Sequence, residues 1–423
     1  MIKGDPMNEP ASDLFLDLLQ ASDPTTLTHQ LRREDPVHYV PSLGFWVITR
    51  HDDVKWLLND PEYGSRDRSI WEHFEPRKEG TWLRWFDDHN FARHDPVAHA
   101  KFRRRFISAL TPRAVRRMDA QILEVVERFA APLRNRPGEI IDLVAEFTNP
   151  IPNTVISRVT GVSPGADEVR FRELAQGLIR GFFPFTPPEL MAMAEKCLGE
   201  MADWVRQLAA ERRASLGEDL ISDLLRAQAQ DDSLDDDEII MLITLMIGAG
   251  SETTNFGSMA MIQTLLEHPN ELERLRANRG LIPQAMGELM RFATGGGAAG
   301  GLLRWAGRDF ELRGKKLEKG QMLLLSFGAA NRDPEIFPDP DHLDLDRDTR
   351  DSLVFGHGAH YCLGANLAKQ EMGAMLDAAL DILTPGSRLR EDLQEYRMLG
   401  LASRPCSLPV EIAEGSGRQT ASR

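Results

Sequence analysis

The chain has 423 residues, of which 42% are hydrophobic, and its formal net charge is −15. The hydrophobic content is enough for a sizeable core, while the negative charge argues against a general nucleic-acid binder and suits a soluble protein. The three cysteines cannot form a disulfide framework and the N-terminus has no signal-peptide pattern, so we expect a cytoplasmic protein.

Strand signals in the sequence are short, and most segments carry the helical period. Residues 37–50 are rich in β-branched and aromatic residues, and a helical pattern follows over 51–60. A second β-rich stretch spans 303–327. We therefore predict one mainly α-helical domain with small β-sheets.

Long helices are predicted between these β-rich stretches. One covers residues 111–133, with Thr111 as N-cap and Pro112 at the first helical position. Another covers 234–269, with acidic residues at its start and a proline at its end. Its apolar run, 239–250, is well short of the roughly 20 residues that a bilayer needs, so we predict a buried helix and no membrane insertion.

Cys362 lies between glycines in the stretch FGHGAHYCLGANLAKQE, just before a helical pattern. Free backbone N–H groups at a helix N-terminus stabilise a thiolate and lower its pKa. Gly358 and Gly364 permit a close approach of the backbone to a large planar ligand. Taken alone, Cys362 is equally well explained as a buried small hydrophobic residue.

The pattern around this cysteine is more specific than the cysteine itself. Phe355, Gly358, His360, Cys362 and Gly364 fit Phe-x-x-Gly-x-His-x-Cys-x-Gly, which resembles the cysteine-ligand loop of the cytochrome P450 superfamily. The resemblance implies a single triangular fold, mainly α with small β-sheets. It also implies non-covalently bound haem b, with Cys362 as the thiolate ligand of the iron.

The resemblance covers nearly the whole chain. It implies a haem-thiolate monooxygenase domain over residues 36–410, with an N-terminal extension, 1–35, and a flexible C-terminal tail, 411–423. One stretch departs from the family pattern. After residues 291–292 the family usually continues with a proline-containing entry to a strand, whereas this chain has ATGGGAAGG.

The predicted helix 234–269 contains the segment GAGSETT. This segment resembles the oxygen-activation segment of the same family, which implies that the Thr253 hydroxyl lies near bound dioxygen and that Glu252 relays protons from solvent. Ala249 shares the helix face of Thr253, and the small Ala249 and Gly250 would leave room for dioxygen. The competing interpretation is a helix-packing glycine followed by solvent-facing polar residues.

The two propionates of haem require cations. His99 and Arg103 resemble the His-x-x-x-Arg of the helix beside the haem, and Arg304 occupies the position of the family's strand arginine. His360 of the cysteine loop is the fourth candidate. Charge-assisted hydrogen bonds to carboxylates explain this choice of residues. Each of the four could individually be a solvated surface base.

Glu288 and Arg291 form an i, i+3 pair of opposite charge. Such pairs are common on helix surfaces. In the family, the same Glu-x-x-Arg is a buried structural lock, and the resemblance implies Arg347 as a third partner. We assign these residues to the scaffold and not to the chemistry.

Small residues at positions where the family normally has bulky aliphatic ones favour a wide, apolar substrate pocket. The competing interpretation of the glycines after the Glu288 helix is a flexible turn. An aromatic stretch that includes Phe182 would serve as an access lid. The predicted pocket residues are Leu245, Gly248, Ala299, Gly300, Phe182, Met398 and Leu399.

The resemblance implies a bacterial-type monooxygenase that inserts one atom of dioxygen into a hydrophobic, bulky organic substrate and reduces the other to water. Electrons from NAD(P)H would arrive through a separate redox partner, because the chain has no fused reductase sequence. A peroxide-driven peroxygenase and a non-catalytic haem sensor are the alternatives, and the presence of Glu252 and Thr253 argues against both.

A basic segment is the candidate docking site for that partner. Residues 101–117 hold seven basic and no acidic residues, although the whole chain is acidic. Local positive charge steers an acidic ferredoxin despite the overall charge. The other interpretation is a solvated helix face that also supplies haem-propionate ligands.

Overall fold

The computed structural model of the chain describes residues 13–21, 23–67, 70, 77–90, 96–106, 110–162, 167–180, 186–230, 234–294, 300–399 and 401–414. Its residues group into two compact units, each assembled from segments that are distant in the sequence. Unit 1 consists of Met1–Phe74, Thr294–Leu343 and Thr349–Tyr361, and unit 2 of Glu75–Ala293, Asp344–Asp348 and Cys362–Arg423.

Unit 1 is built around a five-stranded sheet of order β1-β2-β8-β5-β3. Its central strands β2 and β8 are parallel and fully buried, so they are continuous apolar runs rather than alternating ones. Both β-rich stretches predicted from the sequence therefore meet in one sheet. The strands are β1 (Val37–Val40), β2 (Phe45–Ile48), β8 (Met322–Ser326), β5 (Gly301–Ala306) and β3 (Gly64–Ser65), with a separate hairpin of β6 (Phe310–Leu312) and β7 (Lys315–Leu317).

Short helices accompany this sheet in unit 1. The predicted helix over 51–60 is confirmed as α3, His51–Asn59. Two helices lie within the predicted N-terminal extension, and Phe15 of the first packs edge-on against Phe45 at 5.8 Å between ring centroids. The remaining helices of this unit are α1 (Leu14–Gln20), α2 (Thr25–Glu34), α15 (Phe327–Ala330) and the 3-10 turn η7 (Gly358–His360).

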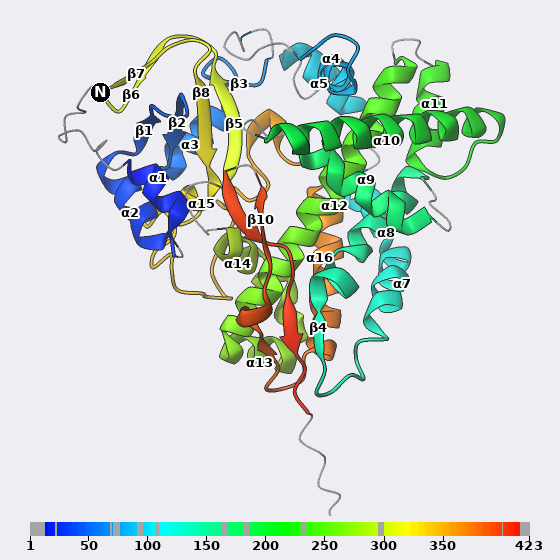
Figure 1. Ribbon diagram of the computed structural model, residues 1–423, viewed down its shortest axis with the longest axis vertical. Helices are drawn as coiled ribbons and strands as arrows, with labels where there is room; N and C mark the ends of the chain where they lie inside the picture. The colour runs from blue at the N-terminus through cyan, green and yellow to red at the C-terminus, as the bar shows by residue number, and fades with distance from the viewer. Residues whose placement is uncertain are drawn as a thin grey trace, which may run out of the picture. The chain divides into compact units, whose positions relative to one another are not determined.

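Unit 2 is mainly helical, and its long helix α12, Asp236–Glu267, runs through the middle of it beside α16 (Figure 1). The helix begins with a capping box between Asp235 and Glu238, which satisfies two N-terminal backbone donors. It is long and apolar enough to cross a membrane, but 67% of its most apolar window is buried inside the protein. The predicted buried helix is thus confirmed.

The other helices of unit 2 surround α12, and α8, α9, α10 and α16 pack against it. They are α4 (Trp82–His89), α5 (Pro96–Phe106), α6 (Pro112–Arg116), α7 (Asp119–Ala130), η4 (Val144–Thr148), α8 (Pro150–Thr160), α9 (Glu168–Arg180), α10 (Pro188–Ala214), α11 (Leu220–Gln230), α13 (Pro269–Ala277), η6 (Arg279–Leu281), α14 (Ile282–Thr294), α16 (Ala365–Ile382) and η8 (Glu391–Leu393).

Small sheets complete unit 2. One has the order β4-β12-β9, and the other is an antiparallel hairpin of β10 and β11. The bounds of these strands are β4 (Ile140–Asp142), β9 (Arg388–Leu389), β10 (Tyr396–Leu399), β11 (Ala402–Pro405) and β12 (Pro409–Glu411). The predicted class, mainly α with small sheets, is confirmed.

The prediction of one continuous helix over residues 111–133 is wrong, because the structure has two helices there. Thr111 caps the start as expected, because its hydroxyl accepts the N–H of Ala114 at 3.2 Å. The chain then forms two helices, since the N–H groups of Arg117 and Met118 bond three residues back instead of four. These tighter bonds end α6 before α7 begins.

Candidate functional site

Cys362 of unit 2 lies just before α16, and the residue is exposed. Burial of its sulfur raises the pKa of the thiol above its ordinary value, while the backbone N–H of Gly364 and the charge of Arg103 oppose that rise. The lowered pKa expected from the helix N-terminus is therefore wrong for the protein alone, because desolvation outweighs the helix end. A cationic metal would remove this cost by holding the thiolate.

Gly364, in the same turn, has a φ of −85° that any residue adopts. A Cβ built there would meet no atom within 4 Å, so no contact with the protein explains the glycine. The open space next to Cys362 suits a flat group lying against the turn. This observation fits the planar ligand that the sequence predicts.

Gly358 belongs to unit 1 and has a different reason to be glycine. Its φ is +69°, and a Cβ there would lie 2.9 Å from the carbonyl oxygen of Leu58 in α3. Both the backbone conformation and the close approach therefore require glycine. Phe355 and His360 of the same loop are half-buried, and the Phe355 ring lies 6.3 Å from that of Tyr361.

Arg304 on β5 of unit 1 is 1% exposed, and no ion pair joins it to another of the described residues. Its Nη1 donates to the carbonyl oxygen of Leu303 at 2.9 Å, while Nε and Nη2 have no hydrogen-bond partner among the described residues. Burial, with the nearby charge of Arg66, holds the pKa of Arg304 well below its usual range. A buried cation in this state needs an anion, and a haem propionate is the right chemical type.

The two other predicted propionate ligands lie on α5 of unit 2. His99 is 2% exposed and Arg103 is half-buried, one helical turn further along. Burial lowers the pKa of Arg103, and the negative charge of an ionised Cys362 raises it again. The structure thus brings Arg103 and Cys362 together, as a site for a thiolate-bound haem requires.

The GAGSETT segment forms part of α12, where Ala249 and Thr253 are exposed and the residues between them are mostly buried. The Thr253 hydroxyl donates to the Ala249 carbonyl oxygen at 2.5 Å. A Cβ on Gly250 would lie 3.1 Å from Cδ1 of Ile156, so α12 packs closely on α8 at this glycine. Ala249 and Thr253 thus form a small exposed stripe, and a ligand is able to reach α12 there although the helix is otherwise buried in the core.

Two predicted pocket residues also lie on α12. Leu245 is half-buried and packs against the hydrophobic core of unit 2, and Gly248 is buried. Gly300 is half-buried in unit 1, and its carbonyl oxygen accepts the N–H of Gly328 at 3.1 Å. Phe182 and Ala299 lie outside the described residues, as do the side chains of Met398 and Leu399.

Glu252 has a partner that the sequence analysis did not find. The carboxyl group is 2% exposed, and its Oε1 forms an ion pair with Nη2 of Arg397 on β10. Its Oε2 has no hydrogen-bond partner in the described part of the chain. No local pattern links two residues that are 145 positions apart, so only the pairing of β10 near α12 reveals this contact.

The predicted structural lock is confirmed. Arg291 donates to both oxygens of Glu288, at 2.6 and 2.8 Å, and both residues are 0% exposed. Arg347 donates to Oε1 of Glu288 at 3.1 Å, and the backbone N–H of Asp344 donates to the same oxygen at 3.1 Å. The lock holds α14 to the segment 344–348 within unit 2.

Glu371 on α16 is a second buried carboxyl group that the sequence analysis missed. It is 3% exposed, and its Oε1 has no hydrogen-bond partner among the residues that the structure describes. Burial alone raises the pKa of Glu371 to about 8. The side chain is therefore protonated at neutral pH, because burial removes the water that would stabilise its charge.

Glu371→Gln is expected to remove a pH dependence of stability. The pKa of Glu371 rises from 4.5 to about 8 on folding. Its contribution to the free energy of unfolding is therefore fully present below pH 4.5 and is lost as the pH rises toward 8. Relative to the variant, the wild type should lose about 1.4 kcal/mol of unfolding free energy per pH unit in that window. Urea denaturation at several pH values measures this slope, and equal slopes for the two proteins would refute it.

The exposed Glu189 supplies a matched control for this experiment. Glu189→Gln should show the wild-type pH dependence, because an exposed carboxyl group has similar surroundings in the folded and unfolded chain.

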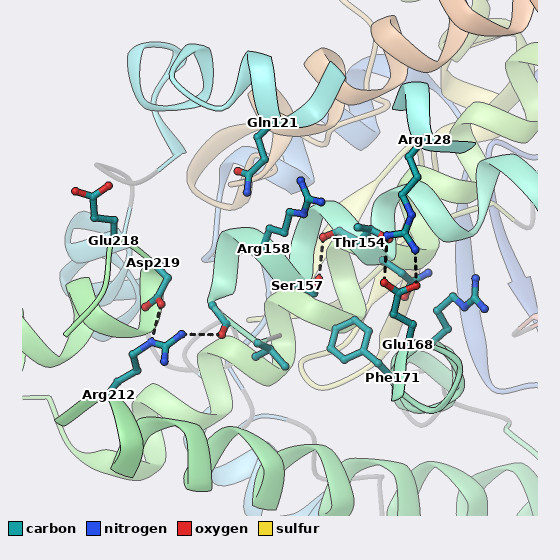
Figure 2. A pocket seen from close by; sticks show the side chains of 14 residues that line it. Gln121, Arg128, Thr154, Ser157, Arg158, Glu168, Phe171, Arg212, Glu218 and Asp219 are labelled. Atoms are coloured by element: carbon teal, nitrogen blue, oxygen red, sulfur yellow. Dashed lines mark hydrogen bonds and ion pairs between the residues drawn. The ribbon is translucent and has the colours of Figure 1, made fainter. Parts of the chain in front are cut away.

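A cavity of about 440 Å³ opens among α7, α8, α9 and α10 of unit 2 (Figure 2). Its walls include two charged pairs: Arg128 pairs with Glu168 through two bonds of 3.2 Å, and Arg212 pairs with Asp219 at 2.7 Å. None of the predicted site residues lines it. Its chemistry does not suit the apolar substrate pocket that the sequence predicts.

Comparison with known proteins identifies the family. Residues 38–384 match the family model described as cytochrome P450. The chain is 35% identical to nocardicin C N-oxygenase of Nocardia uniformis subsp. tsuyamanensis, over 86% of this chain and 89% of that protein. It is 34% identical to mycinamicin IV hydroxylase/epoxidase of Micromonospora griseorubida, over 90% of this chain and 94% of that protein.

Solved structures agree with the family match. The crystal structure of CYP109E1 from Bacillus megaterium in complex with testosterone has a TM-score of 0.81 and 26% sequence identity to this chain, and the alignment covers 94% of this chain and 99% of that one. The fold and the sequence matches extend over most of each chain. The protein therefore belongs to the cytochrome P450 family and is an oxidoreductase of the monooxygenase type.

Proposed function

We propose that this protein is a cytoplasmic haem-thiolate monooxygenase that uses dioxygen to oxidise a hydrophobic, bulky organic substrate. The observation that carries the proposal is the turn at Cys362. It combines the Cys362 thiol, the N–H of Gly364, the nearby charge of Arg103 and open space where a Cβ of Gly364 would lie.

Haem b is the cofactor that fits these residues. When bound, it supplies the redox chemistry that activates dioxygen. Cys362 would bind the iron, while Arg304 would donate to a propionate with the two guanidinium nitrogens that have no partner in the described chain. His99, Arg103 and His360 are the further propionate ligands, and Phe355, Gly358, Gly364 and Ala249 would border the ring.

The proton route of the proposal uses two neighbouring residues of α12. Thr253 carries its hydroxyl on the exposed stripe, where it is able to turn from the Ala249 carbonyl oxygen toward a bound ligand. Glu252 is buried beside it and is held by Arg397 through one oxygen. The carboxylate would receive protons and pass them toward the Thr253 hydroxyl.

Thr253→Ala is expected to retain haem and substrate binding but to divert electrons into peroxide. Product formed per NAD(P)H consumed should fall several-fold, because proton delivery is no longer controlled at the reacting oxygen. Thr253→Ser keeps the hydroxyl and should retain most of the coupling. Measurement of product, peroxide and NAD(P)H in one assay decides the matter, and unchanged coupling in Thr253→Ala would remove Thr253 from the mechanism.

An acidic ferredoxin is the proposed electron donor, bound at exposed arginines of α5 and α6. Arg104, Arg113, Arg116 and Arg117 are exposed in unit 2. Helix α6 packs against α16, the helix that follows Cys362. A partner docked on these arginines would thus lie close to the cysteine turn.

Reversal of charge at Arg104 and Arg116 to glutamate is expected to weaken reduction by an acidic ferredoxin by about tenfold or more at low salt. The effect should shrink as salt rises, since screening shortens the range of the attraction. Stopped-flow reduction rates measure it. Turnover driven by added peroxide is the control and should be spared, whereas equal loss in both assays would contradict a docking role.

The substrate is proposed to be bulky and apolar, because Gly300 and Ala249 are small. The relatives include an N-oxygenase and a hydroxylase/epoxidase, so similar proteins oxidise different groups. The position of the bound substrate is proposed to decide which bond this protein oxidises. Spectral titration of the haem-loaded protein with compounds of increasing size tests the substrate class. Preference for small polar compounds would contradict it.

A further inference from the structure

Two arginines of the β10–β11 hairpin reach the same helix. Arg397 of β10 and Arg404 of β11 are directly opposite each other in the antiparallel pair. Arg397 forms the ion pair with Glu252, and the Arg404 guanidinium lies 5.2 Å from the centroid of the Phe256 ring. Glu252 and Phe256 are one helical turn apart on α12, so the hairpin is attached to α12 by two adjacent contacts of different kinds.

The ion pair is unequal in its burial. Glu252 has 3% of its side-chain surface exposed, whereas Arg397 has 30% exposed. A carboxylate that deep in a protein depends on its cation, because the loss of that partner leaves a charge without water or a counter-charge. The contact uses Oε1, and Oε2 is without a hydrogen-bond partner in the described chain.

We propose that Arg397 is a positioning residue for Glu252, which rests on the proposed role of Glu252 in proton delivery. Arg397 holds the carboxyl group in place through Oε1, and it leaves Oε2 to accept a proton. Because Arg397 belongs to β10, the state of Glu252 depends on the conformation of the β10–β11 hairpin.

The energetic part of the inference is tested on the haem-loaded protein by a double-mutant cycle in thermal stability. Arg397→Gln and Glu252→Gln should each lower the Tm by several degrees, and the double variant should lose clearly less than the sum. Arg404→Gln is the matched control from the opposite strand. Its cycle with Glu252→Gln should be close to additive, because Arg404 contacts Phe256. Additivity in the Arg397 cycle would overturn the proposal.

Arg397→Lys keeps the positive charge and should show a smaller loss of Tm. If Arg397→Gln does not fold, the double variant with Glu252→Gln should recover folding, because no buried carboxylate is then left unpaired, and a double variant that also fails to fold would overturn the proposal.

The functional part is measured with the tightest-binding compound of the spectral titration and a bacterial [2Fe–2S] ferredoxin. Arg397→Gln should release several-fold more peroxide per NAD(P)H and show a larger solvent isotope effect than the wild type. Arg397→Lys should recover part of the coupling, and Arg404→Gln should stay near the wild type. Such results would support the positioning role.

The controls separate this inference from the proposed function. If Glu252→Gln leaves coupling and the isotope effect unchanged, the proposed role of Glu252 fails, whatever Arg397 does. If Glu252→Gln uncouples the reaction and Arg397→Gln does not, the role of Glu252 stands and the positioning role of Arg397 is wrong.

Discussion

Cys362→Ala is expected to abolish the red-shifted Soret band that a thiolate-ligated haem protein gives when it is reduced under carbon monoxide. Cys362 lies at the N-terminal end of α16, and the N–H of Gly364 and the charge of Arg103 favour its ionised form against the effect of burial. Alanine supplies no ligand. An absorbance difference spectrum of the carbon monoxide complex is the measurement.

The two other cysteines are the controls for this experiment. Cys197 is buried in α10, and its Sγ would be 2.2 Å from a Cβ on Gly177, which indicates a tight packing position. Cys406 is half-buried and follows β11. Both alanine variants should keep the band. Loss of the band in either one, with retention in Cys362→Ala, would assign the ligand elsewhere.

Arg291→Met is expected to lower the free energy of unfolding by about 3–5 kcal/mol, because it leaves a fully buried Glu288 without its bidentate partner. Arg347 and the N–H of Asp344 still reach one oxygen, but the other oxygen loses its donor. Chemical denaturation of the purified variant measures the effect.

A surface pair provides the matched control. Arg279 bonds to Asp377 at 3.0 Å and to Asp381 at 2.5 Å, and its side chain is 34% exposed. Arg279→Met should cost only about 0–1 kcal/mol, because exposed ion pairs compete with water. Similar losses of unfolding free energy in the two variants would show that the buried Glu288–Arg291 pair stabilises the protein no more than an exposed pair does. Replacement of both Glu288 and Arg291 by apolar residues should recover part of the stability, since no buried carboxylate is then left unpaired, and the loss of the Arg347 bond to Glu288 should keep the recovery incomplete.

Local patterns predicted much of this protein. The start of α12 depends on Asp235 and Glu238, three residues apart, and both were part of the acidic helix start in the sequence. The turn at Cys362 is also local, because its glycines and the helix N-terminus are within a few residues of the sulfur. Period and capping are properties of neighbouring residues, so the sequence alone carries them.

The family resemblance added long-range information in one case. Glu288 and Arg291 alone predict a common surface pair, and the third partner Arg347 came from the resemblance. The structure confirms the partner and the complete burial of the pair. The break between α6 and α7 was missed, because the residues around Arg117 and Met118 have ordinary helical propensity.

Only the tertiary structure determined which charged side chains are buried and which groups they contact. Arg397 reaches Glu252 across 145 positions, Arg304 is enclosed without a counter-charge among the described residues, and burial keeps Glu371 protonated. The sequence by itself determined the family, the cysteine turn and the main helices, because those depend on residues close together in the chain. The electrostatic state of each buried group depends instead on the water that folding removes and on the partners that distant segments bring to it.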